Sequence, residues 1–384
     1  MRQEAPMRKD VIDLSRAVPP VVPALEAALA KSIEARVYRP DAGGLLRTNR
    51  PRGTEEDRRT GAEWISQRLG FTPDIDRMIV TNGTLNVLFL LLNHLVGRSG
   101  TLLTEEMTYP NMQALSGILG FNIRGIPMDR EGLKPDAFED VCRKIDTSKV
   151  LYTIPTVQNP TAAVMSSGRR VEIATIARRY NVLIIEDDAQ ALMVEDAGAP
   201  IATLAPELTW YVMGLAKTVV MGMRVAFLMA PRAGDAAALM EKFGKMSMWF
   251  VAALHAELAQ AFVANRTAHE ATTSIRKIAA SRRRIAAEVL QRPDLAGGPL
   301  GLHVWVPTRP DARSLASEAL AAGVLVRPGF QFAAEPVPTG AMQGLRVSYC
   351  ETRNEDDLRR GLAILAKIIS ARNAWPDTAA TSGH

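Results

Sequence analysis

Short apolar runs alternate with helical patterns over residues 77–230, and this alternation limits the fold more than any other feature of the sequence. Apolar runs rich in β-branched residues predict strands at residues 78–80, 101–103, 150–153, 182–185 and 208–213. Amphipathic spacing predicts helices at residues 85–95, 111–119 and 169–180. Strands that alternate with helices indicate an α/β fold with a doubly wound, mainly parallel sheet.

Four residues with useful chemistry each follow one of these apolar runs, namely Gly83, Asn159, Asp187 and Lys217. Ligands of doubly wound sheets bind beyond the carboxyl ends of the strands. We therefore expect the four residues to meet at one edge of the sheet.

Lys217 lies between the apolar run at residues 208–213 and a glycine-containing turn, and Arg224 follows at the start of a second apolar run, residues 225–229. A lysine at the end of a buried strand can be desolvated, which favours its neutral amine and makes it a candidate for a Schiff base. The planar donors of a nearby arginine suit a phosphate group. A lone lysine would instead be read as a solvated loop residue.

Three further segments accompany Lys217 and Arg224. They are Thr-Asn-Gly-Thr-Leu-Asn at residues 81–86, Pro-Thr-Val-Gln-Asn-Pro-Thr at residues 155–161 and Ile-Ile-Glu-Asp-Asp at residues 184–188, and a late Leu-Arg-Val-Ser follows at residues 345–348. In this order and spacing, they resemble the fold-type I aminotransferases that depend on pyridoxal 5′-phosphate. The likeness spans residues 13–369 and is nearest to 2-aminoadipate and kynurenine aminotransferases and to the aminotransferase-like domain of MocR regulators.

The resemblance implies catalytic roles for Lys217, Asp187 and Asn159. Lys217 would carry the cofactor as a Schiff base and move a proton at the substrate. Asp187 would pair with the pyridine nitrogen; Asp188 is its rival, although a helix-capping role fits Asp188 better. Asn159 would donate to the ring oxygen of the cofactor and contact the substrate carboxylate, or else only form a turn before Pro160.

Further binding roles follow from the same resemblance. Backbone N–H groups at Gly83, Thr84 and Leu85, where a helix opens after a strand, would hold the phosphate together with Arg224. Tyr109 would stack on the cofactor ring, the alternative being a core tyrosine. Arg346 would clamp the α-carboxylate of the substrate, the alternative being a surface ion pair.

The sequence departs from the family pattern at several places around the cofactor. Gln190 stands where relatives carry a tyrosine that would touch the cofactor ring. Gly214 and Ala216 replace serines near the phosphate, and Ala162 replaces a glycine after the Asn-Pro-Thr motif. The tyrosine that relatives send across a dimer interface would fall near Thr48.

The chain of 384 residues is 47% hydrophobic, which is enough for about two domains. We expect a large cofactor-binding domain at residues 51–270. A smaller α+β domain would combine residues 1–50, as the resemblance implies, with residues 271–384. The latter contain a basic amphipathic helix at residues 272–290 and strands at residues 302–306, 324–326 and 344–349. The tail after Trp375 has the composition of a disordered segment.

Composition also bears on partners and location. Cys142 and Cys350 lie in no cluster of metal-ligand spacing, so we expect a reduced, cytoplasmic protein without a metal site. The longest apolar runs are too short to span a membrane. The formal charge is +5, but acidic residues are interspersed with the arginine clusters, so we expect no nucleic-acid partner.

These observations favour a homodimeric transaminase that transfers an amino group from an L-amino acid to a 2-oxo acid. One alternative is a lyase, oxidase or cyclase that uses the same cofactor, because Gln190 replaces a tyrosine that would contact the cofactor. Another is a ligand-sensing regulator domain that lacks its DNA-binding module. The chain starts directly with the family's N-terminal segment and shows no winged-helix module before it, which favours the enzyme.

Overall fold

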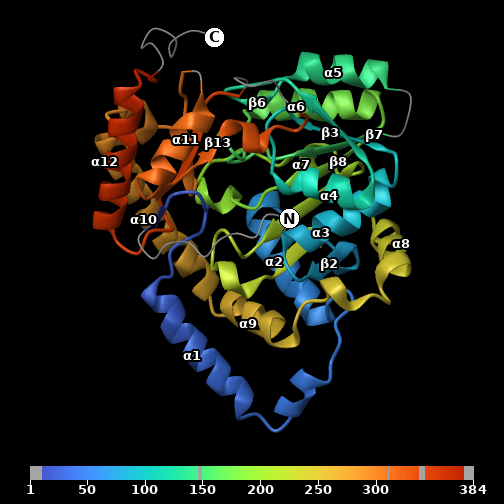
Figure 1. Ribbon diagram of the computed structural model, residues 1–384. Helices are drawn as coiled ribbons and strands as arrows, with labels where there is room; N and C mark the ends of the chain where they lie inside the picture. The colour runs from blue at the N-terminus through green and yellow to red at the C-terminus, as the bar shows by residue number, and fades with distance from the viewer. Residues whose placement is uncertain (1–10, 146–148, 310, 337–341, 376–384) are drawn as a thin grey trace.

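The computed structural model describes residues 11–145, 149–309, 311–336 and 342–375. In this part of the chain, the central element is a seven-stranded sheet with the order β2-β10-β9-β8-β7-β3-β4 (Figure 1). Its strands are β2 (Met78–Thr81), β3 (Thr101–Glu105), β4 (Asn122–Ile126), β7 (Lys149–Thr153), β8 (Val182–Asp187), β9 (Thr209–Gly214) and β10 (Ala226–Met229). Strand β10 runs antiparallel to both neighbours, whereas the remaining pairs are parallel.

Helices cover both faces of this sheet because successive side chains of each strand point to opposite sides. On β7, Val150 and Tyr152 belong to one apolar cluster, and Leu151 between them belongs to the other. The first cluster includes residues of α3 (Thr84–Leu91), α4 (Asn111–Leu119) and α8 (Ala233–Phe243). The second includes residues of α5 (Pro135–Lys144), α6 (Ser167–Arg179) and α7 (Ile201–Leu204). The prediction of a doubly wound, mainly parallel sheet is therefore confirmed.

The predicted strands and helices of this region are present, one helix ends differently, and several observed elements, among them β4, β10 and α5, were not predicted. The helix predicted at residues 85–95 is α-helical only to Leu91 and continues as a π-helical turn, η3 (Leu92–Val96). Strand β4 was not predicted, because its sequence, Asn-Ile-Arg-Gly-Ile, is half polar. As an edge strand it is only partly buried, so it lacks the apolar run that marks the central strands.

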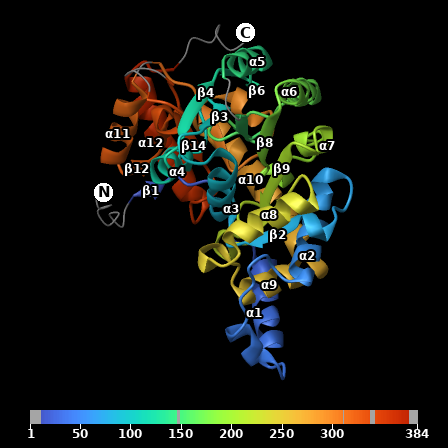
Figure 2. The same cartoon turned by 90° about the vertical axis from the view of Figure 1, so that its right-hand side faces the viewer.

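A smaller layer follows the long helix α10 (Thr267–Val289). Strands β11 (His303–Val306), β14 (Leu345–Ser348) and β13 (Arg327–Pro328) form an antiparallel sheet in that order. Helices α11 (Ala312–Ala321) and α12 (Glu355–Ala371) lie beside this sheet in Figure 2. Strand β12 (Val324–Leu325) pairs in parallel with β1 (Ile12–Asp13) from the start of the chain. This is the α+β arrangement predicted for the C-terminal region; the exact domain boundaries stay a prediction.

Helix α1 (Pro23–Val37) projects away from both sheets and ends in the short turn η1 (Ala42–Leu46) (Figures 1 and 2). Pro23 occupies its first turn, where the fixed φ of proline suits a helix start. Arg50, which follows the projecting segment, pairs with Asp57 of α2 (Glu55–Leu69) at 2.8 Å and with Glu257 of α9 (Ala253–Ala264) at 3.0 Å. These buried ion pairs hold the chain that follows the projecting segment against α2 and α9.

The other regular elements are short. They are the hairpin of β5 (Met128–Asp129) with β6 (Gly132–Leu133), and the 3-10 turns η2 (Ile75–Arg77), η4 (Ala191–Met193), η5 (Met221–Met223), η6 (Ser247–Trp249), η7 (Pro293–Ala296) and η8 (Gly329–Phe332). Among the helices of the described residues, none has the length and apolar character needed to cross a membrane. The predicted disordered tail after Trp375 lies outside the described residues.

The close packing of α2 on the sheet yields a stability test. A Cβ atom on Gly61 would lie 2.6 Å from Cδ1 of the Phe227 ring, which is itself 1% exposed. Gly61→Ala should lower the free energy of unfolding by about 1–2 kcal/mol, because overpacking outweighs the gain in helix propensity. Gly117→Ala is the control, since it lies in α4 with no atom within 4 Å of the added Cβ, and it should raise that free energy by up to about 1 kcal/mol. Equal gains for both variants in urea unfolding would contradict this packing.

Candidate active site

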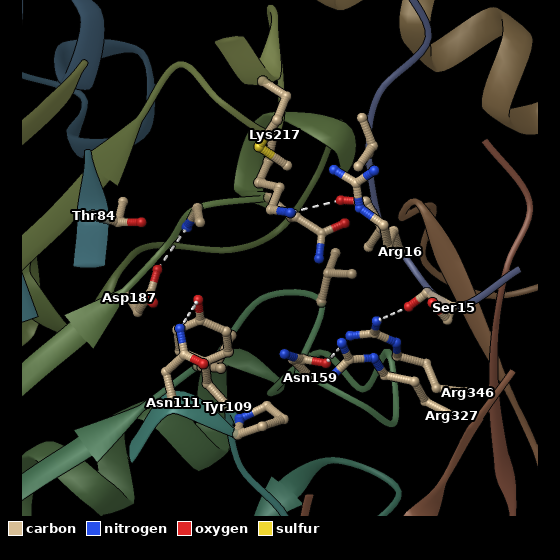
Figure 3. A pocket seen from close by; sticks show the side chains of 18 of the residues that line it. Ser15, Arg16, Thr84, Tyr109, Asn111, Asn159, Asp187, Lys217, Arg327 and Arg346 are labelled. Atoms are coloured by element: carbon tan, nitrogen blue, oxygen red, sulfur yellow. Dashed lines mark hydrogen bonds between the residues drawn. The ribbon is translucent and has the colours of Figure 1, made fainter. Parts of the chain in front are cut away.

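A cavity of about 340 Å³ lies between the carboxyl ends of the large sheet, the small sheet and the start of the chain. Seven of the residues singled out from the sequence line it: Thr84, Tyr109, Asn159, Asp187, Gln190, Lys217 and Arg346. Figure 3 shows most of these side chains pointing into one space. Of the four strand-end residues expected to meet, Asn159, Asp187 and Lys217 line this cavity, whereas Gly83 does not and only precedes the lining residue Thr84.

Lys217 lies in the turn after β9 and is half-buried. Its Nζ donates a hydrogen bond to the carbonyl oxygen of Ala17 at 2.6 Å, across the cavity to the N-terminal segment. Burial lowers the pKa of Lys217 to about 8, and the positive charges of Arg346 and Arg16 act in the same direction. A solvated loop lysine would have none of these features. The arrangement gives Lys217 a larger fraction of neutral amine near physiological pH than a solvated lysine has.

Asp187 ends β8 and faces the cavity, whereas Asp188 points to the other side of the sheet. The Asp187 carboxylate accepts a hydrogen bond from the Tyr152 hydroxyl at 2.8 Å and one from the Ala189 N–H at 3.2 Å. Burial raises the pKa of Asp187 to about 6, although the Tyr152 bond opposes that rise. Asp187 is thus a buried carboxylate with hydrogen bonds but no ion pair among the described residues.

Asp188 is fully buried and has its own partners. Its carboxylate accepts a hydrogen bond from Arg68 Nε at 3.1 Å and one from the Tyr211 hydroxyl at 2.7 Å. The alternation of side chains along β8 separates the two aspartates, as anticipated from the sequence. The helix-capping interpretation of Asp188 is wrong, because the residue before η4 is Gln190 and Asp188 pairs with Arg68 instead.

Arg346 and Asn159 meet at the opposite wall of the cavity. Arg346 Nη1 donates to Asn159 Oδ1 at 2.7 Å, and Nη2 donates to the Ser15 carbonyl (Figure 3). Burial lowers the pKa of Arg346 to about 9, with Arg327 as the next cause. No carboxylate of the described residues forms an ion pair with it, so Arg346 is not a surface salt-bridge arginine.

The loop that carries Asn159 is held by Gln158. Gln158 Nε2 donates to the Met107 carbonyl at 2.6 Å, and Gln158 Oε1 accepts from the N–H of Thr161 at 3.0 Å. Ala162 adopts a φ of 60°, in the left-handed region that glycine occupies most easily. The loop therefore has the conformation that a glycine would favour, even though an alanine stands there.

The N-terminus of α3 forms an anion-binding cradle. The N–H groups of Thr84 and Leu85 have no partner within the helix, and Thr84 adds a hydroxyl on the cavity side. The Gly83 N–H, which the resemblance assigned to the phosphate, instead donates to the Thr81 carbonyl at 2.9 Å and is not free for a ligand. Arg224 approaches so closely that a Cβ on Gly83 would lie 3.4 Å from its Nη2. The side chain of Leu85 packs in the apolar cluster, so only its backbone can serve a ligand. These donors fit a phosphate group.

Gly214, where the resemblance implies a serine, lies in a tightly packed position. A Cβ there would lie 3.1 Å from Cγ2 of Thr84 and 3.2 Å from the Val225 carbonyl oxygen. The methyl group of Thr84 thus takes the space that a serine side chain would need.

Tyr109 and Gln190 line the cavity from different sides. The Tyr109 hydroxyl accepts a hydrogen bond from Asn111 Nδ2 at 2.8 Å, and its half-buried ring packs against the apolar cluster while it also lines the cavity. Gln190 Oε1 accepts from the N–H of Leu302 at 3.1 Å, next to strand β11. Gln190 therefore links the large sheet to the small one. A tyrosine at this position has no amide oxygen to accept this hydrogen bond.

Several cavity residues were not identified from the sequence, among them Arg16, Asn111, Tyr152 and Arg327. Tyr152 lies within a predicted strand and reads as a core residue. Arg16 and Arg327 belong to segments that meet the site only through the fold. The one available signal was the position of Arg327 directly after the apolar run at residues 324–326.

Comparisons with known proteins agree with this architecture. The sequence model of one family, aminotransferase class I and II, matches residues 9–365. The uncharacterized HTH-type transcriptional regulator YdeF of Bacillus subtilis is 26% identical over 309 residues, which are 79% of this chain and 65% of that protein. An aromatic amino acid aminotransferase of Schizosaccharomyces pombe is 34% identical over 140 residues, 32% of this chain and 29% of that protein. The crystal structure of an archaeal alanine:glyoxylate aminotransferase is similar with a TM-score of 0.84 and 22% identity, covering 94% of this chain and 91% of that one.

The raised pKa of Asp187 predicts a pH-dependent stability effect. Because the folded protein binds this proton more tightly than the unfolded chain, protonation of Asp187 contributes to the free energy of unfolding. This contribution is fully present at low pH and is lost as the pH rises through about 6. Asp187→Asn should therefore stabilise the cofactor-free protein at pH 8 by about 1–3 kcal/mol, and by about half as much at pH 5. Urea unfolding at both values measures the difference. An equal effect at pH 5 and pH 8 would show that the Asp187 charge is not the cause.

Proposed function

Because the chain belongs to the aminotransferase class I and II family, we propose that it is a pyridoxal-phosphate-dependent aminotransferase, which moves an amino group from an L-amino acid to a 2-oxo acid. The family match confirms the recognition made from the motifs, and pyridoxal 5′-phosphate is the cofactor that goes with it. The observation that carries the proposal is one cavity that contains an amine of lowered pKa, a buried carboxylate, a phosphate cradle and an arginine without a carboxylate partner.

The residues present fit this cofactor. The α3 N-terminus and Arg224 would hold the phosphate, Tyr109 would stack on the ring and Asp187 would face the pyridine nitrogen. Asn159 uses its amide oxygen to accept from Arg346, so its NH₂ group remains for the ring oxygen. Pyridoxal phosphate supplies an electron sink for the carbanion at the substrate α-carbon.

Lys217 would hold the cofactor covalently and then move the proton at the substrate α-carbon. A general base works best when its pKa lies near the working pH, and the pKa of Lys217 is lowered to about 8. Asp187 has the complementary task. Its charge lacks a cationic partner among the described residues, so a protonated pyridine nitrogen beside it would stabilise the carboxylate, and the carboxylate would keep that nitrogen protonated.

Arg346 would orient the substrate by its α-carboxylate. Its guanidinium is buried and, among the described residues, hydrogen-bonded only to Asn159 and the Ser15 carbonyl, so its position is set before a ligand arrives. The same amino and oxo acid positions would serve both halves of a ping-pong reaction. A homodimer and a cytoplasmic location remain predictions.

Two other functions stay open. Gln190, in place of a tyrosine, motivates a lyase, oxidase or cyclase on the same cofactor. A regulator domain is favoured by the relatives named HTH-type transcriptional regulators. The chain spans about two thirds of the length of two such regulators of Bacillus subtilis, YdeF and YisV, 65% and 66%. Turnover of an amino acid and a 2-oxo acid distinguishes the enzyme from both.

The covalent attachment to Lys217 is the first test. The protein loaded with pyridoxal phosphate should be yellow, and borohydride reduction should fix the pyridoxyl group on the peptide that contains Lys217. Lys217→Met should abolish both the fixed label and transamination. Lys242→Met is the matched control, because Lys242 is exposed and bonded to the Asn93 carbonyl. Labelling at Lys242, or full activity of Lys217→Met, would refute the proposal; labelling without turnover would favour a sensor domain.

The second test concerns the carboxylate clamp. Arg346→Ala should reduce kcat/KM for amino acids by an amount equivalent to about 2–5 kcal/mol, as the loss of one partner of a buried charge pair does. Cofactor affinity should change little, because Arg224 and not Arg346 lies at the phosphate cradle. Arg359→Ala, in an exposed pair with Glu288 at 3.2 Å, is the control. Equal turnover of amino acids and simple amines by the unaltered protein would exclude a clamp.

A further inference from the structure

Two arginines stand side by side in the wall of the cavity. Arg327 on β13 and Arg346 on β14 are directly opposite each other in the antiparallel ladder. Directly paired residues point to the same face, with Cβ atoms about 4.5–5.5 Å apart. Both side chains line the cavity, and Figure 3 shows them running next to each other.

This pairing is unfavourable without a ligand. Like charges directly opposite on a sheet destabilise it. Arg327 is half-buried, and within the described ranges it forms no ion pair with a carboxylate. Arg16, which also lines the cavity, differs in both respects. Its side chain is 55% exposed and is paired with Glu351 at 2.9 Å. In the part of the chain that the structure describes, Arg327 is therefore the cavity arginine whose charge is balanced neither by a carboxylate of the protein nor by a group of the proposed ligands.

The other cations already have tasks in the proposed function. Arg224 lies at the phosphate cradle, and Arg346 holds the α-carboxylate. We propose that Arg327 binds a second carboxylate, so that the substrates are acidic L-amino acids and dicarboxylic 2-oxo acids. Ligands of this class, such as aspartate and glutamate, have two or three carbon atoms between their carboxylates. This inference rests on the proposed function for the role of Arg346.

Equilibrium binding tests the ligand class without catalysis. Glutarate and pentanoate have the same number of carbon atoms but two and one carboxylates, and calorimetry on the cofactor-loaded protein can compare them. We expect glutarate to bind roughly 10–100-fold more tightly, as befits one additional charge-assisted contact. Arg327→Met should remove most of this preference and leave pentanoate binding unchanged. Arg327→Lys should retain part of it, and thermal melts will establish that both variants are folded.

Two further variants sharpen the assignment. Arg232→Met is the matched control, since Arg232 is exposed and paired with Asp235 at 2.9 Å, and it should keep the full preference. Loss of the preference in Arg16→Met instead of Arg327→Met would overturn the assignment. So would an equal loss of glutarate and pentanoate in Arg327→Met, because both arginines would then hold one carboxylate.

Kinetics with L-glutamate and L-norvaline separate this inference from the proposed function. We expect Arg327→Met to lower kcat/KM for L-glutamate and not for L-norvaline. If neither amino acid is turned over while the preference for glutarate persists, the proposed function fails and the dicarboxylate site stands. If the unaltered protein turns over both equally and binds glutarate no better than pentanoate, the proposed function stands and the dicarboxylate site is refuted.

Discussion

The ion pair of Asp188 with Arg68 beneath the sheet is the interaction on which the site depends. Asp187 and Asp188 are consecutive, and both are buried. Because Arg68 and Tyr211 compensate Asp188 on the far side, β8 can end with a second carboxylate that faces the cavity without a cation. Two uncompensated buried charges at adjacent positions would cost far more than one.

The same network positions the loop that carries Asn159. Glu186, one residue before Asp187, accepts hydrogen bonds from the N–H groups of Ile201 and Ala202 and lies 3.7 Å from Arg170. Arg170 in turn donates to the Pro155 carbonyl at 3.1 Å and to Thr156 at 3.0 Å. The strand that presents Asp187 and the loop that presents Asn159 are thus held by one buried set of contacts.

The cavity side of β8 is electrostatically unbalanced, in contrast to its far side. Burial lowers the pKa values of Lys217 and Arg346 and raises that of Asp187, so each shift favours the neutral form of the group. Each of these costs would be relieved by a group of a bound cofactor or substrate. Relief of this unfavourable burial when a ligand binds therefore adds to the free energy of binding. Such destabilisation is common at sites that are formed before the ligand binds.

The sequence by itself determined the doubly wound sheet, the edge at which the site forms and most of its residues, because strand periodicity and strand ends are local properties. Gly83, Asn159, Asp187 and Lys217 were found in this way. It left Asp187 and Asp188 as rivals, since the alternation of side chains along a strand indicates that they point apart but not which side faces the cavity.

Only the tertiary structure decided which aspartate faces the cavity, as well as the direction of β10 and the positions of Arg16, Tyr152 and Arg327. Arg327 meets Arg346 through the pairing of β13 with β14, and Arg16 follows β1, which pairs with β12 more than 300 residues later. Such pairings depend on which distant surfaces pack together, and no local pattern in the chain records that choice.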